Sequence, residues 1–417
     1  MQEKHVADDF IDPLVKDAID NSDLWDLVLG VRDIVREQIL PRAVEMARQE
    51  HVSDDVDSLM RENGFFGVSI PSEYGGLGHG LLGDVLVVFE TGYADLSASL
   101  LPVVNPGLFA RAVQIGGTEE QKKFVLPRVV SGELFGCYGL TEPGGSSFRE
   151  SIETKAVRKD GGYILNGQKV FITEADRANV CVVFACIEGS KGVGAFLVPN
   201  RDRPSGYRKD NGYHVVGKEK GKPGIHASAT CAISMDDVEV PERDVLGLDY
   251  DGRQGLGTAV KTLGWSRPLI AAQALGAAKG ALAYTMQYAL ETPRGDGSIR
   301  LLEKELYRAR LGELTGRLSQ GVAYLLNVTR SIDRGDIAAS DPLKVQSSML
   351  KALATDAAVE IARQSMGMLG GSGYTGEHPV GRIWTDLGVP PIYEGHNDLQ
   401  LGHAGRFLSQ HLKKYTS

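Results

Sequence analysis

Residues 155–172, KAVRKDGGYILNGQKVFI, decide the fold, because they form a β pattern in the middle of a largely helical chain. Short runs rich in Tyr, Ile, Val and Phe surround two turn signals, Asp160-Gly161-Gly162 and Asn166-Gly167. Asp-Gly and Asn-Gly pairs favour the tight turns of β-hairpins. Further runs of the same kind follow as CVVFACI, GAFLVPN and CAISMDDVEV. Together they predict a compact antiparallel β domain, which we place at residues 135–248.

The chain before this β region has helical periodicity. Residues 23–38 carry apolar side chains close to the spacing of one helix face. Residues 64–78, GFFGVSIPSEYGGLG, then break the pattern and predict a turn-rich connection. We therefore predict an N-terminal helical domain at residues 1–134.

After the β region, three long segments are again amphipathic. The first, residues 256–291, is studded with Ala and Gly, which suits close contact between helices. We predict a C-terminal four-helix bundle at residues 249–417. Helices, then strands, then helices is an order that argues for segregated elements and against an alternating βαβ sheet. The fold class is therefore α+β with several domains.

The composition excludes several classes of protein. A chain of 417 residues with a net charge of -9 is too acidic for general nucleic-acid binding. No apolar run approaches the ~18 residues of a transmembrane segment, and the polar N-terminal sequence is not a secretory signal. The cysteines form no CxxC pair and no metal cluster with histidine, so we expect a reduced, cytoplasmic setting; they are Cys137, Cys181, Cys186 and Cys231.

Three short motifs point to other chemistries but lack the required context. Gly371-x-Gly373-x-x-Gly376 matches the dinucleotide fingerprint, yet a helical pattern precedes it where the fingerprint needs a strand. His396 and His403 have no carboxylate or cysteine that completes a ligand set, so we expect no metal site. Ser372 lies outside a GxSxG frame. A helix-ending glycine loop and packed or solvated histidines are the better interpretations.

Three longer segments, taken in order, are far more specific. They are YGLTEPGGSS at residues 138–147, KVFITEADRANV at 169–180, and MGMLGGSGYTGEHPVGRIWTDLGVPPIYEGHNDLQ at 366–400. With the helix–β–helix pattern, their order and spacing resemble the acyl-CoA dehydrogenase family over nearly the whole chain. The resemblance implies a flavoprotein with FAD between the β domain and the C-terminal helices, and an acyl-CoA thioester as its substrate.

The first two segments match the flavin-binding parts of the family. Small residues let backbone N–H groups approach a phosphate, which suits the glycines and serines of the first segment. Thr141 can donate to a ring heteroatom, whereas Phe171 and Thr173 match the pair that packs on the flavin and hydrogen-bonds near N5. Taken alone, these segments fit a glycine-rich turn and a strand aromatic in a core. The resemblance assigns to the cofactor Tyr138, Leu140, Thr141, Gly145, Ser146, Ser147, Phe171, Ile172 and Thr173.

Glu394, in the sequence Ile-Tyr-Glu-Gly, matches the family's catalytic base. Desaturation needs a carboxylate here, because a base removes the α-proton of the thioester while a β-hydride goes to flavin N5. In the family, the base residue's own backbone N–H and a flavin ribityl hydroxyl polarise the thioester carbonyl. Burial is expected to raise the pKa of this carboxylate toward the working pH. Without the resemblance, a carboxylate at a helix N-terminus would be the simpler interpretation.

Some family members carry the base on an earlier helix, one residue before an arginine. That position is Ser266 here, before Arg267, so Glu394 is the only base at either location. This points away from the branched-chain subgroup. Arg267 matches the family's arginine near the substrate, and an ion pair on the helix surface is an equal alternative. The resemblance assigns to the substrate Ser147, Arg267, Tyr393 and Gly395.

The parts that hold the FAD of a neighbouring subunit in the family are altered in this chain. The usual arginine followed by Phe-Gly is replaced by ETPRGDGSIR, in which Arg294 is a loose match, and the usual glutamine is Gly367. Elsewhere, Phe148 stands for an aspartate and Glu174 for an asparagine. The resemblance still implies a tetramer, of like subunits or of pairs of unlike subunits. The further cofactor positions are Arg294, Gly367, Gly370, Gly371, His396 and Asp398.

The resemblance predicts FAD-dependent α,β-dehydrogenation of an acyl-CoA, with electrons passed to an electron-transfer flavoprotein. Two alternatives stay open: a flavin oxidase or monooxygenase on the same fold, and a non-catalytic subunit of a heteromeric complex. Intact Glu394, Thr141 and Thr173 argue for a catalytic site. The acyl group is not readable, because straight-chain, cyclic, aromatic and dicarboxylic thioesters all remain open.

Overall fold

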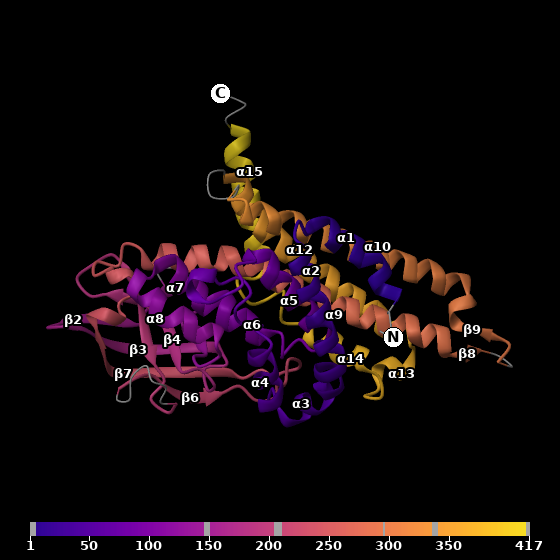
Figure 1. Cartoon of the computed structure of the whole chain (residues 1–417), viewed down its shortest axis with the longest axis horizontal. Helices are drawn as coiled ribbons and strands as arrows, with labels where there is room; N and C mark the ends of the chain where they lie inside the picture. Colours follow the sequence, from indigo (N-terminus) through magenta and orange to yellow (C-terminus); the bar gives the residue numbers. More distant parts are fainter. Residues whose placement is uncertain (1–5, 146–150, 204–210, 295–296, 336–340, 414–417) are drawn as a thin grey trace.

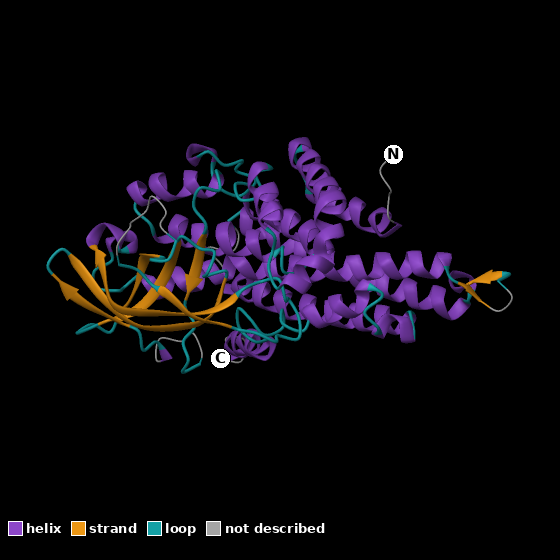
Figure 2. Ribbon diagram, turned by 90° about the horizontal axis from the view of Figure 1, so that it is seen from below, coloured by secondary structure: helices purple, strands orange, loops and turns teal. Residues whose placement is uncertain are grey.

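A helix of 37 residues, α9 (Gly255–Glu291), runs along the long axis of the molecule and connects its parts. The computed structural model describes residues 6–145, 151–203, 211–294, 297–335 and 341–413, with the backbone alone for 341–344. The strands gather at one end of the molecule and long helices form the other end (Figures 1 and 2). No helix among the described residues is long and apolar enough to cross a membrane.

The N-terminal part is helical, as predicted. Its second helix is shorter than the periodicity indicated, because the chain widens into a π-helical turn at Val35–Ile39. Helix α8 begins at a capping box, in which the Thr118 side chain accepts from the Gln121 N–H and the Gln121 side chain accepts from the Thr118 N–H. The helices are α1 (Val6–Ala18), α2 (Ser22–Ile34), α3 (Ala43–Gln49), α4 (Asp54–Glu62), α5 (Gly80–Ala94), α6 (Leu100–Val104), α7 (Arg111–Gly116) and α8 (Glu119–Val130).

Glycines let α5 and α9 cross almost in backbone contact. A Cβ added at Gly276 would lie 2.1 Å from the Phe89 carbonyl oxygen, and one at Gly92 would lie 2.6 Å from the Gln273 carbonyl oxygen. The small residues of α9 therefore serve close helix packing, as the sequence predicts. Helix α9 also packs against α12 and α10, which follow it in the chain.

The middle region forms one seven-stranded sheet with the order β1-β4-β2-β3-β7-β6, in which β5 pairs with β4. The sheet is mainly antiparallel, as predicted, although β1 and β2 both pair with β4 in parallel. The strands are β1 (Gly136–Gly139), β2 (Lys155–Lys159), β3 (Gly162–Thr173), β4 (Val180–Ile187), β5 (Val193–Pro199), β6 (His214–Lys218) and β7 (Thr230–Pro241).

Only one of the two turn signals in residues 155–172 is a turn. The Asp160-Gly161 pair joins β2 to β3 in a hairpin, as predicted. The Asn166-Gly167 pair lies inside β3 at a bulge against β7, so the second predicted turn is wrong. Gly167 has φ +152°, and a Cβ there would lie 2.6 Å from the Thr154 hydroxyl oxygen. The glycine thus permits a close approach within the sheet.

The C-terminal part is helical, as predicted. Helices α9, α10 and α12 pack against one another, whereas α15 packs on α12 and then projects from the body of the molecule (Figure 1). A two-stranded hairpin, β8 (Pro293–Arg294) and β9 (Ile299–Arg300), follows α9 at the far end. The helices after it are α10 (Glu305–Asp333), α12 (Asp341–Met368), α13 (Gly371–Tyr374), α14 (Pro379–Asp386) and α15 (Asn397–Lys413).

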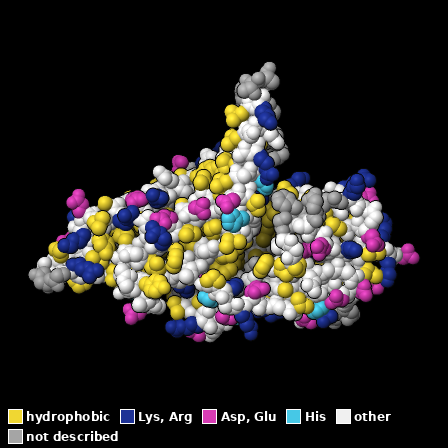
Figure 3. All heavy atoms as spheres, turned by 180° about the vertical axis from the view of Figure 1, so that it is seen from behind, with side chains coloured by type: hydrophobic (Ala, Val, Ile, Leu, Met, Phe, Trp, Pro, Cys, Tyr) yellow, Lys and Arg dark blue, Asp and Glu magenta, His cyan; other side chains and the backbone are white. Residues whose placement is uncertain are grey.

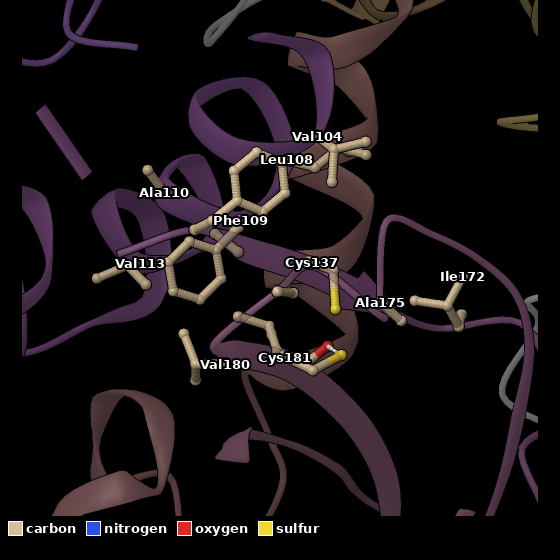
Figure 4. Close-up of a cluster of buried hydrophobic side chains, with 14 of the residues drawn as sticks. Val104, Leu108, Phe109, Ala110, Val113, Cys137, Ile172, Ala175, Val180 and Cys181 are labelled. Atoms are coloured by element: carbon tan, nitrogen blue, oxygen red, sulfur yellow. Dashed lines mark hydrogen bonds between the residues drawn. The ribbon is translucent and has the colours of Figure 1, made fainter. Parts of the chain in front are cut away.

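A continuous apolar core joins the N-terminal helices to the sheet. In Figure 4, Phe109 and Val113 lie over Cys137 of β1 and Cys181 of β4. A Cβ at Gly136 would lie 2.0 Å from the Phe109 ring, so only glycine permits this contact. The packing fixes the position of β1, which includes Tyr138, the first residue of the predicted flavin segment.

Candidate active site

Glu394 lies on a tight turn between α14 and α15. Its backbone has φ +53°, a left-handed conformation that costs a non-glycine residue roughly 1–3 kcal/mol. The next residue must be glycine, since Gly395 has φ +92° and a Cβ there would lie 2.1 Å from the Gln400 side-chain nitrogen. None of the backbone hydrogen bonds that the described residues form in this turn uses the Glu394 N–H. The strained turn therefore leaves the backbone N–H of Glu394 available as a donor, next to the half-buried carboxylate of the same residue.

The Glu394 carboxylate has a specific polar partner on α9. The hydroxyl of Ser266, which is fully buried, donates to Glu394 Oε2 at 2.5 Å. Burial raises the pKa of Glu394 to about 7, against the opposing effects of Ser266, Arg267 and Lys351. Sequence reasoning noted Ser266 as the other base location but assigned it no role. The fold brings the two locations together, although they are far apart in the chain.

Arg267 is half-buried near the base. Its guanidinium Nη1 donates to the Ser348 hydroxyl at 3.1 Å, and among the described residues it forms no ion pair with a carboxylate. The alternative of an ion pair on the helix surface is therefore wrong. Burial lowers the pKa of Arg267, and the charge of Glu394 opposes this shift. Arg267 Nε is buried without a hydrogen-bond partner in the described part of the chain, so a donor is left for a ligand.

Tyr393, the residue before the base, is held by a polar chain that reaches the N-terminal helices. Its hydroxyl donates to Gln273 Oε1 at 2.6 Å. Gln273 Nε2 in turn donates to the Ser99 hydroxyl at 2.8 Å and to the Leu96 carbonyl at 2.9 Å. Nothing in the sequence indicated this series of hydrogen bonds; Gln273 is one polar residue among the many small residues of α9.

Tyr138 of β1 faces the same region. Its ring packs against Phe184 with 5.1 Å between ring centroids, and its hydroxyl donates to the Ala259 carbonyl at 3.4 Å. Burial raises the pKa of Tyr138 well above 10, and the charge of Glu394 adds to this shift. The first predicted flavin segment and the predicted base are therefore within electrostatic reach of each other.

A buried ion pair holds the loop that follows Tyr138. The Lys169 ammonium is fully buried and donates to Glu142 Oε1 at 2.6 Å, to the Phe184 carbonyl at 2.6 Å and to the Leu140 carbonyl at 3.3 Å. The Glu142 carboxylate also accepts from Thr154. Leu140 is buried and Thr141 half-buried beside this pair, while Gly145 is exposed; Ser146 and Ser147 lie outside the described residues. Sequence reasoning missed the roles of Lys169 and Glu142.

Phe171 has an exposed ring on the sheet. It lies at the irregularity of β3 between Lys169 and Ile172, with φ +58°, and is 64% exposed. Ile172 is buried, whereas Thr173 is half-buried and opposite Thr230 of β7. A large aromatic side chain held outward by a strained backbone is suited to stacking on a flat ligand.

Glu174 explains one departure from the family pattern. Its φ is +57°, a conformation that asparagine adopts more readily than glutamate. Its buried carboxylate accepts from the Ala229 N–H at 2.9 Å, from the Ser228 hydroxyl at 3.0 Å and from Arg177 Nε at 3.1 Å. Glu174 thus anchors the end of β3 rather than contributing to the site.

Most of the remaining assigned residues lie apart from this group within one chain, whereas His396 follows the turn of Glu394 directly. Arg294 in β8, Gly371 at the start of α13 and Gly370 directly before it belong to elements at the end of the molecule away from the large sheet (Figure 1). Gly367 lines an open pocket of about 360 Å³ with Tyr307, Arg310, Arg363 and Gln364. His396 and Asp398 are exposed at the start of α15.

The residues around Glu394 and Phe171 fit a flavin. The chain has an exposed aromatic ring and a half-buried threonine on β3, and a carboxylate of raised pKa that acts electrostatically on Tyr138 of β1. Figure 3 shows the surface hollowed at the foot of the projecting α15, the helix that follows Glu394, with hydrophobic side chains on the visible wall. A flat, mainly apolar ring with polar edges suits such a hollow.

Comparison with known proteins gives consistent results along the chain. Three sequence models match in order: the N-terminal domain of acyl-CoA dehydrogenase at residues 25–133, the middle domain at 137–238 and the C-terminal domain at 253–409. An acyl-CoA dehydrogenase of Bacillus subtilis is 32% identical over 377 residues, which cover 89% of this chain and 93% of that protein.

Solved structures agree. A glutaryl-CoA dehydrogenase from Mycobacterium smegmatis in complex with FADH2 is similar with a TM-score of 0.83 and 27% identity, covering 95% of this chain and 96% of that one. A chain of a structure described as the electron transferring flavoprotein of Acidaminococcus fermentans is similar with a TM-score of 0.84 and 29% identity, covering 93% and 98%.

Proposed function

The chain belongs to the acyl-CoA dehydrogenase family, whose cofactor is FAD, and on that premise we propose that it desaturates the α,β bond of an acyl-CoA thioester with Glu394 as the base. The observation that carries this proposal is the half-buried carboxylate of Glu394, with a pKa raised to about 7, on a strained turn beside an available backbone N–H. A base is most effective when its pKa lies near the working pH.

The residues of this chain would act in the following way. Glu394 takes the α-proton, while its own backbone N–H donates to the thioester carbonyl and stabilises the charge that develops there. Ser266 holds one carboxylate oxygen in place, and Arg267 offers an unpaired donor nearby. FAD, when bound against Phe171, Thr141 and Thr173, supplies the acceptor for the β-hydride at flavin N5.

We further propose that the electrons pass to an electron-transfer flavoprotein and that the protein works in the cytoplasm. The likeness to a chain from an electron transferring flavoprotein structure supports the first point. The acyl group stays open, since no described side chain near Glu394 selects one class of thioester.

The test is anaerobic reduction of the yellow holoenzyme by a panel of straight-chain, cyclic, aromatic and dicarboxylic acyl-CoAs, followed by turnover with an artificial electron acceptor. We expect at least one thioester to bleach the flavin. The rate of bleaching is expected to rise with pH through about 7, because only the ionised form of Glu394 accepts a proton. Rapid reoxidation by oxygen would favour an oxidase or monooxygenase instead. A colourless protein without FAD would favour the non-catalytic subunit.

We also propose a tetramer of like or unlike subunits. The elements that carry the residues assigned to a neighbour's FAD lie at the end of the molecule away from the sheet. In this proposal, a second copy or an unlike subunit supplies the corresponding residues to the flavin of this chain. The projecting helix α15 exposes leucines that an isolated monomer would leave in water, namely Leu399, Leu401, Leu408 and Leu412. Sedimentation of the active species is expected to give a tetramer; an active monomer would contradict this assembly.

A further inference from the structure

Lys351, on α12, is a fully buried lysine whose ammonium reaches the turn that carries Glu394. Its Nζ donates to the Gly395 carbonyl at 3.0 Å and to Asn397 Oδ1 at 2.9 Å. Asn397 is itself fixed, because its side-chain nitrogen donates to Asp356 Oδ1 at 2.7 Å and to the Thr355 hydroxyl at 2.9 Å. The ammonium therefore ties the turn after Glu394 to the middle of α12.

This contact differs from those of the other fully buried lysines. Lys169 forms an ion pair with Glu142 at 2.6 Å, and Lys279 forms one with Asp8 at 2.8 Å. Lys351 forms no ion pair with a carboxylate among the described residues and has only neutral acceptors within hydrogen-bonding distance. Burying a charge without a direct partner costs several kcal/mol. A methionine would fill the same volume without that cost, so packing alone does not account for the lysine.

The charges around Lys351 come from three elements. Glu394 faces it from the turn, Arg267 from α9 and Asp356 from its own helix. On α15, His403 lies near Arg267 and Arg406, and its pKa is lowered by burial. Burial lowers the pKa of Lys351 to about 8, and Glu394 opposes this shift. At neutral pH the ammonium is therefore mostly charged, and its positive charge lowers the pKa of the Glu394 carboxylate.

We propose that Lys351 is a positioning residue for the base: its ammonium fixes the turn of Glu394 and Gly395, and its positive charge favours the ionised form of the Glu394 carboxylate. The inference rests on the proposed role of Glu394. The hydrogen bond to the Gly395 carbonyl holds the turn from the side of α12, so that the strained backbone of Glu394 keeps its orientation. Misplacement of a reacting group by about 1 Å costs up to ~10²-fold in rate.

The decisive variant is Lys351→Met, which keeps the volume and removes the charge. The first readout needs neither substrate nor turnover: the carboxylic C=O band of Glu394 is titrated by infrared difference spectroscopy and assigned with Glu394→Gln. We expect the pKa of Glu394 to rise by about one unit, the lower end of the effect of a nearby opposite charge. The second readout is flavin reduction at pH 7, which is expected to slow ~10–100-fold while the dissociation constant of acyl-CoA stays unchanged.

Lys279→Met is the matched control, because it removes an equally buried ammonium from α9, where the ammonium is paired with Asp8 and Glu90 and makes no contact with the turn. It is expected to lower stability and to leave the pKa of Glu394 unchanged. If Lys351→Met does not fold, Lys351→Gln replaces it, since an amide can still donate to the Gly395 carbonyl but carries no charge.

An unchanged pKa of Glu394 in the folded, uncharged Lys351 variant would overturn the electrostatic half of the proposal. An unchanged rate of reduction in Lys351→Met, which cannot donate to the Gly395 carbonyl, would overturn the positioning half. A wild-type protein that no acyl-CoA reduces would refute the proposed function instead, and the infrared titration would still decide whether Lys351 acts on Glu394.

Discussion

Glu394→Gln is expected to keep FAD and to bind acyl-CoA, yet to be reduced by its substrate at least ~10²–10⁴-fold more slowly than the wild type. The amide has nearly the same shape as the carboxylate, and the backbone N–H of the turn is retained. Its carbonyl oxygen still accepts from the Ser266 hydroxyl, which donates to the carboxylate in the wild type. What is lost is the carboxylate that we propose takes the α-proton. Stopped-flow bleaching of the flavin measures the effect.

The matched control is Glu360→Gln, a change of the same kind in an exposed ion pair of α12 with Arg363. It is expected to leave bleaching unchanged. Near-normal bleaching in Glu394→Gln would show that Glu394 is not the base. Loss of FAD from that variant would show instead that the residue is structural.

Lys169→Met is expected to lower the free energy of unfolding by about 3–5 kcal/mol. The substitution leaves the Glu142 carboxylate buried without its cation, and it also removes donors from the Leu140 and Phe184 carbonyls. Because these contacts hold the loop after Tyr138, weaker binding of FAD is expected to accompany the loss of stability. Urea unfolding of the apoprotein and titration with FAD measure the two effects separately.

Two further variants separate the buried charge from the loss of a side chain. The double variant Lys169→Met/Glu142→Gln is expected to recover part of the lost stability, since the unpaired carboxylate is gone. Arg310→Ala breaks an exposed pair with Glu313 and is expected to cost only about 0–1 kcal/mol. If Lys169→Met were as stable as the wild type, the buried pair would not hold this loop.

The order of elements was readable from the sequence because it depends on short-range patterns, whereas the base was assigned through the resemblance to the family. Residues 155–172 alternate and turn in a way that only a β region accommodates, and the hairpin at Asp160-Gly161 formed as predicted. The small residues of α9 indicated close helix packing. Glu394 was identified from the segment in which it stands, although its role as the base stays a prediction.

The tertiary structure decided the strand pairing and the side-chain contacts, because both depend on residues that are distant in the sequence. Asn166-Gly167 has the local preference of a turn, but pairing with β7 makes it a bulge within a strand. Arg267 was assigned either to a ligand or to a surface ion pair, and burial against Ser348 removed the second alternative. No pattern along the chain indicates that β1 and β2 pair with β4 in parallel.

The properties of the base itself belong to the fold. A glutamate in the unfolded chain has an ordinary pKa, and burial of the turn raises it to about 7, although Ser266 of α9 and Lys351 of α12 oppose the shift. These partners are distant in sequence, so no local periodicity reveals them. The sequence by itself determined which elements form and which residue carries the carboxylate, through backbone preference and side-chain chemistry. Only the tertiary structure decided which buried groups surround that carboxylate, because desolvation and charge act through space and not along the chain.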